Sequence, residues 1–422
     1  MNTQPTLFSN VQVLDGSGRA PYPGAVLVTG NRITKLADAT RGERLVEPSA
    51  LQVDGGGATL MPGLCDAHTH ITWNNGPSLH ATTEMPVEEH LLLSLDNAKL
   101  YLDCGYTSCV GAASAKPRMD VVLRNVINEG RYPGPRLLAA GMEVATTGAD
   151  VNPSLTADGP DEMRKVVRSV CKEGVDTLKL SLSGEQITGK AFNHETFFTD
   201  EEVIVAVEEA TRRGVRVCAH ARNATSIKMC VKHGVNIIYH ASFVDEETLD
   251  MLEAAKDRVF VAPGLAWLVM TCHHASDWGV TPQMARDMGY FHELECAIES
   301  MKQMKKRGVR VLPGGDYGFA WTPHGTYAKD LEYFVDLLGF SPMDTLVAST
   351  KEGGEIMGRP HELGLVKEGY LADLLLVDGD PLDDITIFQD RDNLLAIMKD
   401  GAFHKHPTRS RRAVATPLRA NQ

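Results

Sequence analysis

Short runs of aliphatic and β-branched residues alternate with longer amphipathic stretches through the middle of the chain, and this alternation limits the fold more than any other feature. The short runs have the length of buried strands, and the longer stretches have the 3.6-residue period of helices. We expect strands at 59–66, 107–110, 136–140, 177–182, 215–220, 236–240, 259–262 and 309–313. Helices are expected between many of them, at 87–104, 161–173, 200–213, 246–256 and 284–307.

About eight strand–helix units over roughly 250 residues are typical of a (β/α)8 TIM-type barrel, whose active site lies at the carboxyl ends of the strands. We therefore predict an α/β protein with a catalytic barrel over residues 61–360. A doubly wound sheet is the alternative. That fold would not favour a β domain built from both chain ends, which is what the flanking sequence indicates.

The flanking segments, residues 1–60 and 361–405, contain short strands broken by turn residues such as Asp15-Gly16 and Gly30-Asn31. Each segment is too small to hold a core alone, so we expect the two to form one composite β-sandwich domain. Residues 406–422 carry four arginines and little apolar pattern. We expect a basic tail that is either disordered or a contact in an oligomer.

The composition indicates an enzyme-sized protein and excludes two classes of partner. With 422 residues, of which 43% are hydrophobic, the chain can bury a large core. The formal net charge is -13, and the acidic residues are spread through the helical stretches rather than gathered in a run, which argues against a nucleic-acid surface. The N-terminus lacks a signal-peptide pattern and no apolar run is long enough for a membrane span, so we expect a cytoplasmic protein. The eight cysteines include no Cys-x-x-Cys pair and are expected to be reduced thiols.

The first expected barrel strand ends in Asp66-Ala67-His68-Thr69-His70. In a strand, residues i and i+2 face the same side, so His68 and His70 would point into one space. Two histidines make an incomplete metal site. For this pair alone, a metal site and a pair of structural histidines are equally good interpretations.

Other expected strands also end in residues that can bind a metal. His220 and His240 end the fifth and sixth strands, and Asp316 follows the eighth after two glycines that let the backbone approach a ligand. In the fourth strand, Lys179 interrupts an apolar alternation and would point into the barrel mouth. A buried lysine costs several kcal/mol unless it is paired or neutralised.

The chain resembles the metal-dependent amidohydrolase superfamily in its binuclear form. The resemblance covers nearly the whole chain and is carried by Pro62-Gly63-Leu64-Cys65-Asp66-Ala67-His68-Thr69-His70, Lys179, His220, His240, Gly315-Asp316 and Gly364-Leu365-Val366-Lys367-Glu368-Gly369-Tyr370-Leu371-Ala372-Asp373-Leu374. In that family the strand-four lysine is carbamylated, which turns the cation into an anionic bridge between two metal ions.

The resemblance assigns roles to six residues. It implies two divalent metal ions, expected to be Zn²⁺, held by His68, His70, Asp316, His220, His240 and carbamylated Lys179. Such a metal pair makes a water nucleophilic at neutral pH. Asp316 would take the proton of that water and pass it to the leaving amine. Deaminases of the superfamily use a glutamate near the strand-five histidine. Here His220 is followed by Ala-Arg-Asn, so amide hydrolysis is favoured over deamination.

Three further residues are candidates for substrate binding. Arg222 follows His220 by two positions and would either clamp a substrate carboxylate or lie at the surface. Tyr239 fits core packing, although a twist at the strand end would bring its hydroxyl to a substrate oxygen. His324 lies in the loop after Asp316, and such loops build the pocket of a barrel. The remaining histidines, including His90, are expected at the surface.

The segment 264–274 is interpreted as a long apolar loop that lines an aromatic pocket or forms a subunit interface. The superfamily branch that the sequence most resembles is that of Xaa-Pro-type dipeptidases and carboxypeptidases, and within it amidohydrolases that degrade ochratoxin A. This implies a small amide substrate bearing a carboxylate, the cleavage of ochratoxin A to ochratoxin α and L-phenylalanine, and a homo-oligomer, commonly an octamer. Cyclic-amide or imidazolone hydrolysis is the alternative activity, and a non-catalytic structural barrel is the non-enzymatic one.

Overall fold

The computed structural model describes residues 4–149, 154–188 and 192–408. The chain divides into two compact units. One holds the residues up to Cys65, Tyr101–Ser108 and those from Phe340 on, and the other holds Asp66–Leu100 and Cys109–Gly339. The predicted basic tail lies outside the described residues from 409 on. Within the described ranges, no helix has both the length and the apolarity needed to cross a membrane.

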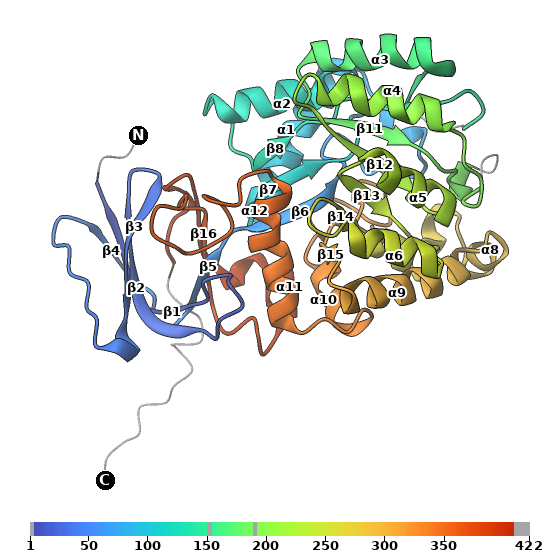
Figure 1. The fold of residues 1–422 in the computed structure, drawn as a ribbon. Coiled ribbons are helices and arrows are strands. Elements are labelled where there is room, and N and C mark those ends of the chain that lie inside the picture. Colours follow the sequence, from blue (N-terminus) through green and yellow to red (C-terminus); the bar gives the residue numbers. More distant parts are fainter. Residues whose placement is uncertain (1–3, 150–153, 189–191, 409–422) are drawn as a thin grey trace. The chain divides into compact units, whose positions relative to one another are not determined.

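In the first unit, strands from both ends of the chain form one eight-stranded sheet (Figure 1). The order is β18-β17-β16-β5-β1-β2-β3, and β4 pairs with β1. Leu60 of β5 lies opposite Leu376 of β16, so the two chain ends meet in the middle of the sheet. The strands are β1 (Thr6–Val13), β2 (Tyr22–Thr29), β3 (Arg32–Asp38), β4 (Leu51–Asp54), β5 (Thr59–Pro62), β16 (Leu374–Val377), β17 (Leu394–Lys399) and β18 (Ala402–Lys405).

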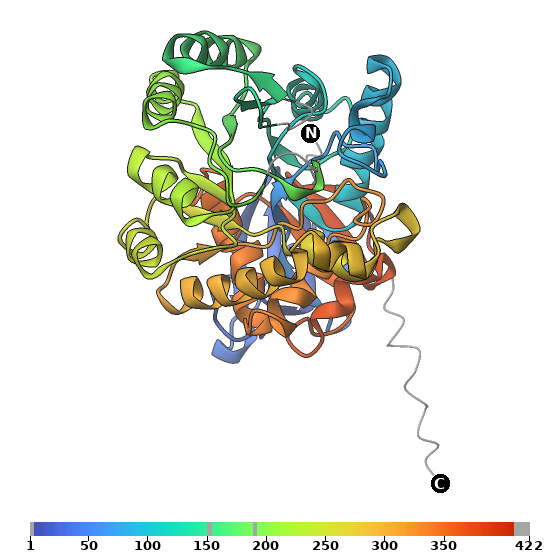
Figure 2. The same cartoon turned by 90° about the vertical axis from the view of Figure 1, so that its right-hand side faces the viewer.

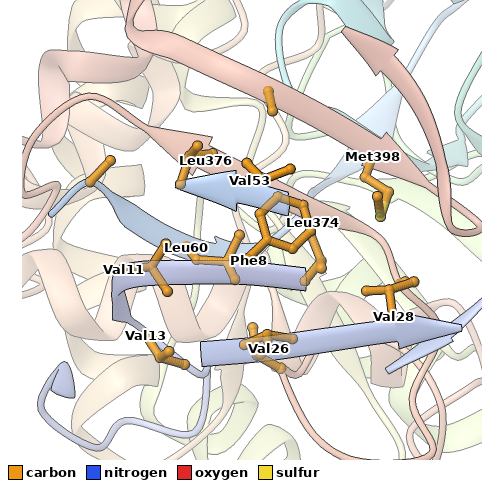
Figure 3. Close-up of a cluster of buried hydrophobic side chains, with 14 of the residues drawn as sticks. Phe8, Val11, Val13, Val26, Val28, Val53, Leu60, Leu374, Leu376 and Met398 are labelled. Carbon is orange, nitrogen blue, oxygen red and sulfur yellow. The ribbon is translucent and has the colours of Figure 1, made fainter. Parts of the chain in front are cut away.

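This sheet curls around its own hydrophobic core. Phe8 of β1 and Phe403 of β18 have ring centroids 6.0 Å apart. In a flat sheet these strands, four steps apart, would lie about 19 Å from each other. Apolar side chains from both chain ends therefore pack face to face, among them Leu60, Leu374 and Met398 (Figure 3).

The expected strand 59–66 is two strands, β5 and β6 (Leu64–Thr69). The break falls at Gly63, where an added Cβ would lie 2.2 Å from Thr107 Oγ1. Only glycine allows so close an approach. One continuous apolar run thus supplies two different sheets, which periodicity alone does not reveal.

The remaining strands form two parallel sheets, as an α/β architecture predicts. One has the order β6-β7-β8 and the other β10-β9-β11-β12-β13-β14-β15. At the edges of the two sheets, Ala67 N donates to Pro313 O (3.0 Å) and Thr177 N donates to Ala139 O (3.1 Å). The strands are β7 (Tyr106–Gly111), β8 (Arg136–Leu138), β9 (Glu143–Ala145), β10 (Ser154–Thr156), β11 (Thr177–Ser181), β12 (Arg216–Ala221), β13 (Ile237–His240), β14 (Phe260–Ala262) and β15 (Arg310–Val311).

In the second unit, helices alternate with these strands and lie on their outer side (Figures 1 and 2). Its helices are α1 (Val87–Asp103), which continues into the first unit, α2 (Met119–Asn128), α3 (Gly159–Glu173), α4 (Asp200–Thr211), α5 (Ala224–His233), α6 (Glu246–Ala254), α7 (Leu265–His273), α8 (Pro282–Asp287), α9 (Tyr290–Lys306) and α10 (Lys329–Asp336). The first unit adds α11 (Pro342–Ser349) and α12 (Lys351–Ile356).

The helices differ from expectation in two places. The predicted loop 264–274 is instead mostly the buried helix α7, because an apolar run without periodicity does not distinguish a buried helix from an extended segment. The predicted helix 284–307 is broken between α8 and α9 at Gly289, whose φ of 84° lies in the left-handed region. The helix break redirects the chain before α9.

Candidate metal centre

Four histidines at or next to the carboxyl ends of parallel strands form one row of imidazole rings. His68 lies in β6, His70 follows it, His220 lies in β12 and His240 ends β13. The ring centroids are 5.4 Å apart for His70 and His68, 5.0 Å for His68 and His240, and 4.4 Å for His240 and His220. Neighbouring parallel strands end at the same edge of a sheet, which explains why His220 and His240 meet. The hydrogen bond from Ala67 N to Pro313 O holds β6, which belongs to the other sheet, beside the chain that follows β15.

Asp316, which follows β15, completes a group of potential ligands. Its Oδ1 lies 3.2 Å from His70 Nε2 and 3.7 Å from His68 Nε2. The ligand atoms of these three residues all lie within 4.8 Å of one another. His220 and His240 stand beside this group as a second imidazole pair.

Lys179 reaches the same centre from the middle of β11. It is 2% exposed, and its Nζ lies 4.4 Å from the ring centroid of Tyr239, which stacks on His68 at 4.1 Å. No hydrogen bond or ion pair joins Lys179 to another residue in the described ranges. Asp316 and Glu143 lie close enough to interact electrostatically with the amine, without a hydrogen bond or ion pair to it.

The ionisation of these residues suits metal binding. Burial holds the pKa of His68, His220 and His240 well below the usual value, so their imidazoles are neutral and carry free lone pairs at neutral pH. Burial would raise the pKa of Asp316, but the neighbouring His68 and His70 hold it below its usual range.

Several of the same buried atoms lack hydrogen-bond partners among the described residues, namely both ring nitrogens of His68, Nδ1 of His70 and His240, and Oδ1 of Asp316. Buried polar atoms are normally satisfied, and unsatisfied ones indicate a missing ion or water. Neutral imidazoles and a carboxylate are ligands that suit zinc and similar divalent cations. The residues therefore fit a metal centre.

The backbone around the centre is strained. His240, Ala241 and Asp316 have φ values of 70°, 48° and 61°, in the left-handed region that non-glycine residues rarely adopt. Gly314 allows the chain after β15 to pass against β6, because an added Cβ would lie 2.5 Å from His68 N. This glycine was expected to admit a ligand, and the structure shows instead that it admits the backbone of His68.

All six candidate ligands line one pocket of about 460 Å³, which we call the histidine pocket. Its other lining residues are Trp73, Leu79, Glu143, Ser181, Glu185, Ile187, Trp267 and Phe319. Glu143 and Glu185 had no signal in the sequence. These glutamates come from β9 and from the segment after β11, and the preference for amide hydrolysis over deamination stays a prediction. Burial raises the pKa of Glu143 to about 7.

Arg222 lies at the centre of a buried ion-pair network, so the alternative of a surface arginine was wrong. It is 1% exposed and donates to Glu293 Oε1 (2.5 Å) and to Glu185. Tyr290 Oη donates to Glu185 Oε1 (2.8 Å), and Ser242 Oγ donates to Glu293 Oε1 (2.7 Å). The guanidinium is thus occupied by two carboxylates of the protein itself, and its proposed contact with a substrate stays a prediction.

The other two substrate-binding candidates are also engaged within the protein. Tyr239 is fully buried, and its hydroxyl donates to Gly111 O (3.4 Å). His324 is buried, with Nδ1 3.2 Å from Tyr327 Oη and Nε2 3.0 Å from Trp73 O. Trp73 stacks on His70 with ring centroids 3.6 Å apart, so His324 supports the residue that packs against a candidate ligand. Substrate contacts of both residues remain predictions.

His90 was expected at the surface, and this expectation was wrong. Its side chain is fully buried on α1, and Nε2 lies 2.6 Å from Thr72 O. Helical context alone gave no indication of this, because the partner lies in the segment after His70 rather than on the same helix. His90 therefore anchors the loop that follows β6.

His324 is expected to make the protein less stable in acid. Burial lowers the pKa of His324 to about 4, whereas in the unfolded chain it is near 6.5. Between these values only the unfolded chain binds the proton, so the free energy of unfolding falls by up to about 3 kcal/mol as pH drops from 7 to 4. Urea unfolding between pH 7 and pH 4 should show a smaller fall in the free energy of unfolding for His324→Gln than for the wild type. Equal losses would contradict the assignment, and the exposed His361→Gln should behave as the wild type.

The sequence is similar to known hydrolases. A family model described as "Amidohydrolase family" matches residues 59–403. Aspergillus niger ochratoxinase is 24% identical over 386 residues, covering 82% of this chain and 76% of the relative. Imidazolonepropionase from Geobacillus sp. (strain WCH70) is 21% identical over 362 residues, covering 80% of this chain and 78% of the relative.

Solved structures show the same fold. A Xaa-Pro dipeptidase with methionine bound in its active site is 25% identical, with a TM-score of 0.85 over 96% of this chain and 100% of that one. The structure of A. niger ochratoxinase, at 22% identity, has a TM-score of 0.81 over 95% of this chain and 96% of that one. Residues 59–403, which the family model matches, contain every strand that carries a candidate ligand.

Proposed function

This chain belongs to the amidohydrolase family, and from that premise we propose that it is a binuclear, zinc-dependent enzyme that hydrolyses amide bonds. The observation that carries the proposal is that His68, His70, Lys179, His220, His240 and Asp316 line one pocket. Each comes from a different strand end or strand, apart from the His68 and His70 pair. No ordinary structural role requires these six side chains to converge.

His68, His70 and Asp316 would hold one cation, His220 and His240 the other, and Lys179 would bridge them as a carbamate. The support for carbamylation is that Lys179 is buried in the same pocket as the five other candidate ligands, where a carbamate would turn its cation into an anionic ligand. When bound, two such cations make a water more acidic and polarise a carbonyl oxygen. Asp316, whose Oδ1 has no hydrogen bond among the described residues, is placed to take a proton from the attacking water and return it to the leaving amine.

We propose N-acyl-L-amino acids or dipeptides as the substrate class, which bear a carboxylate, and ochratoxin A as one member. The proposal is supported by the names of the ochratoxinase and dipeptidase relatives. It is also supported by the aromatic side chains Trp73, Trp267 and Phe319, which line the histidine pocket and offer a face for an aromatic acyl group. Cleavage would release ochratoxin α and L-phenylalanine.

A second candidate activity is the hydrolysis of a cyclic amide such as an imidazolone. The relative named imidazolonepropionase favours it, at lower identity than ochratoxinase. Both activities would use the same metal ligands and differ in the rest of the pocket. A cyclic substrate is compact and would leave the aromatic walls unused, so we place it second.

The finer features of the architecture are also proposals. We propose that the eight strands β6, β7, β8, β11, β12, β13, β14 and β15 form one closed barrel, which the edge hydrogen bonds at Ala67 and Thr177 support. The mixed sheet from both chain ends supports a composite β domain. A homo-oligomer of up to eight subunits and a cytoplasmic location stay predictions.

The test combines metal content with a product screen. Protein reconstituted with zinc is expected to hold two metal ions per chain, to cleave ochratoxin A and dipeptides, and to act weakly on imidazolones. Metal content is measured by mass spectrometry and products by liquid chromatography. A chelator should abolish turnover, and zinc should restore it. Turnover that survives complete metal removal would refute the proposal, and preference for the cyclic amide would select the second activity.

A further inference from the structure

Helix α7 begins without a capping side chain of its own. Its N-cap residue is Gly264, and no side chain at that position accepts a hydrogen bond from the first turn. The first N–H groups of a helix have no acceptor within the helix, so they need one from outside. Ala266 N donates to Asp330 Oδ1 (3.0 Å), and Trp267 N donates to Gly315 O (3.1 Å). The start of α7 is therefore held by a residue of α10 and by the segment that follows β15.

Asp330 also binds the segment after β15 directly. Its Oδ2 accepts a hydrogen bond from Gly314 N (2.8 Å). The carbonyl oxygen of Gly314 accepts in turn from Gly264 N (3.0 Å). Both backbone polar groups of Gly314 are thus fixed, two residues before Asp316. A cap for α7 requires only the contact with Ala266, so the second contact points to a role for Asp330 beyond capping.

The backbone at Asp316 needs support of this kind. Its φ of 61° lies in the left-handed region, which a non-glycine residue adopts only when its surroundings hold it there. The chain has little free space around it, because a Cβ added at Gly264 would lie 3.2 Å from Asp316 Cβ and 3.2 Å from His240 Nδ1. A shift of Gly314 would therefore move the Asp316 carboxylate relative to the neighbouring histidines.

The carboxylate of Asp330 suits this place electrostatically. It is 1% exposed, and no basic side chain pairs with it in the described ranges. Burial raises the pKa of Asp330 to about 6, and the hydrogen bonds from Gly314 N and Ala266 N oppose the rise. At pH 7 the side chain is therefore mainly ionised, and both of its oxygens accept. The positive end of the α7 dipole lies at this carboxylate and favours its negative charge.

We propose that Asp330 is a positioning residue for Asp316, the proposed proton acceptor of the metal centre. It acts through Gly314 and through the start of α7, and it does not touch the substrate. The inference rests on the proposed function and adds the residue that keeps Asp316 in place for the transfer of a proton to the leaving amine. Loss of the carboxylate releases Gly314 and lets Asp316 leave its strained conformation. A displacement of about 1 Å is enough to slow a reaction by about 100-fold.

The experiment uses Asp330→Asn, which keeps the size of the side chain but offers one acceptor atom instead of two. With the zinc-loaded full chain, N-benzoyl-L-phenylalanine is compared with O-benzoyl-L-3-phenyllactate, in which oxygen replaces the scissile nitrogen. The amine must be protonated to leave, whereas the alkoxide of the ester leaves without this help. We expect kcat for the amide to fall by about 10- to 100-fold, with KM changed by less than about threefold. The loss on the ester should be at least about fivefold smaller, because it depends less on proton transfer.

The matched control is Asp336→Asn, which removes an exposed carboxylate of the same helix and should keep both rates within about twofold of the wild type. Metal content and urea unfolding are measured for each variant, and rates are expressed per metal-loaded chain, so that a loss of folded protein is not counted as a loss of rate. Should Asp330→Asn not fold, Asp330→Ser, which retains a hydroxyl acceptor, takes its place in the same comparison.

The outcomes separate the inference from the proposed function. An equal loss on the amide and the ester, or no loss on either, would overturn the inference and leave the proposed amide hydrolysis intact. Failure of both Asp330 variants to fold would also overturn it, because the residue would then be structural only. So would loss of the metal ions from Asp330→Asn, which would show that Asp330 maintains the whole centre. Cleavage of neither substrate by the wild type would overturn the proposed function and the inference with it.

Discussion

Replacing Lys179 by methionine is expected to reduce amide hydrolysis by at least about 1,000-fold, because the variant loses the anionic bridge that positions both cations. Methionine keeps the length and burial of the side chain but cannot be carbamylated. The residue is buried on β11 and contacts the Tyr239 ring, so a thioether also keeps the packing. The measurement is kcat/KM for a cleaved dipeptide together with metal content per chain.

The matched control is Lys302→Met, which removes an exposed lysine of α9 and should leave kcat/KM within twofold of the wild-type value, as expected for a surface substitution away from the site. Metal content should fall from two ions per chain to one or none in Lys179→Met only. A variant that keeps two ions and most of its activity would exclude Lys179 as a bridge. Thermal unfolding of the metal-free proteins should be nearly unchanged, which separates the loss of the bridge from a loss of fold.

The candidate ligands could be predicted because they obey rules that operate along the sequence. Strand polarity brings the carboxyl ends of parallel strands together, so His220 and His240 were expected to meet although each belongs to a different strand. The structure places their rings 4.4 Å apart. Lys179 in β11 could also be identified as a candidate, because it interrupts the apolar alternation of the strand. The metal roles themselves stay predictions.

The acidic side of the pocket could not be predicted, because it depends on contacts between residues far apart in the sequence. Arg222 and Glu293 are separated by 71 positions and meet through the packing of α9. Glu143 lies in a three-residue strand that no periodicity marks. The helix α7 was missed because a segment buried on all sides shows no amphipathic pattern. The sequence does not show which side chain each charged residue contacts. That contact decides whether the residue binds substrate or stabilises the fold.

Arg222 allows the structural role of a buried charge to be measured. Replacing Arg222 by methionine is expected to lower the free energy of unfolding by about 3–5 kcal/mol, because it removes the buried guanidinium that pairs with both Glu185 and Glu293. Burial alone already raises the pKa of Glu185, although Arg222 opposes this shift. The measurement is urea unfolding of metal-free protein at pH 7. The control is Arg131→Met, which breaks an exposed pair with Glu129 and should cost less than about 1 kcal/mol.

A triple variant tests the cause. Adding Glu185→Gln and Glu293→Gln to Arg222→Met removes the charges of both carboxylates together with the cation, and replacing a whole buried network is often far less costly than breaking it. We expect the triple variant to regain at least about 2 kcal/mol relative to Arg222→Met alone. If the triple variant is as unstable as the single one, the loss arises from side-chain packing rather than from unpaired charge. If Arg222→Met is as stable as the wild type and instead raises KM for carboxylate-bearing substrates, the arginine is a substrate clamp after all.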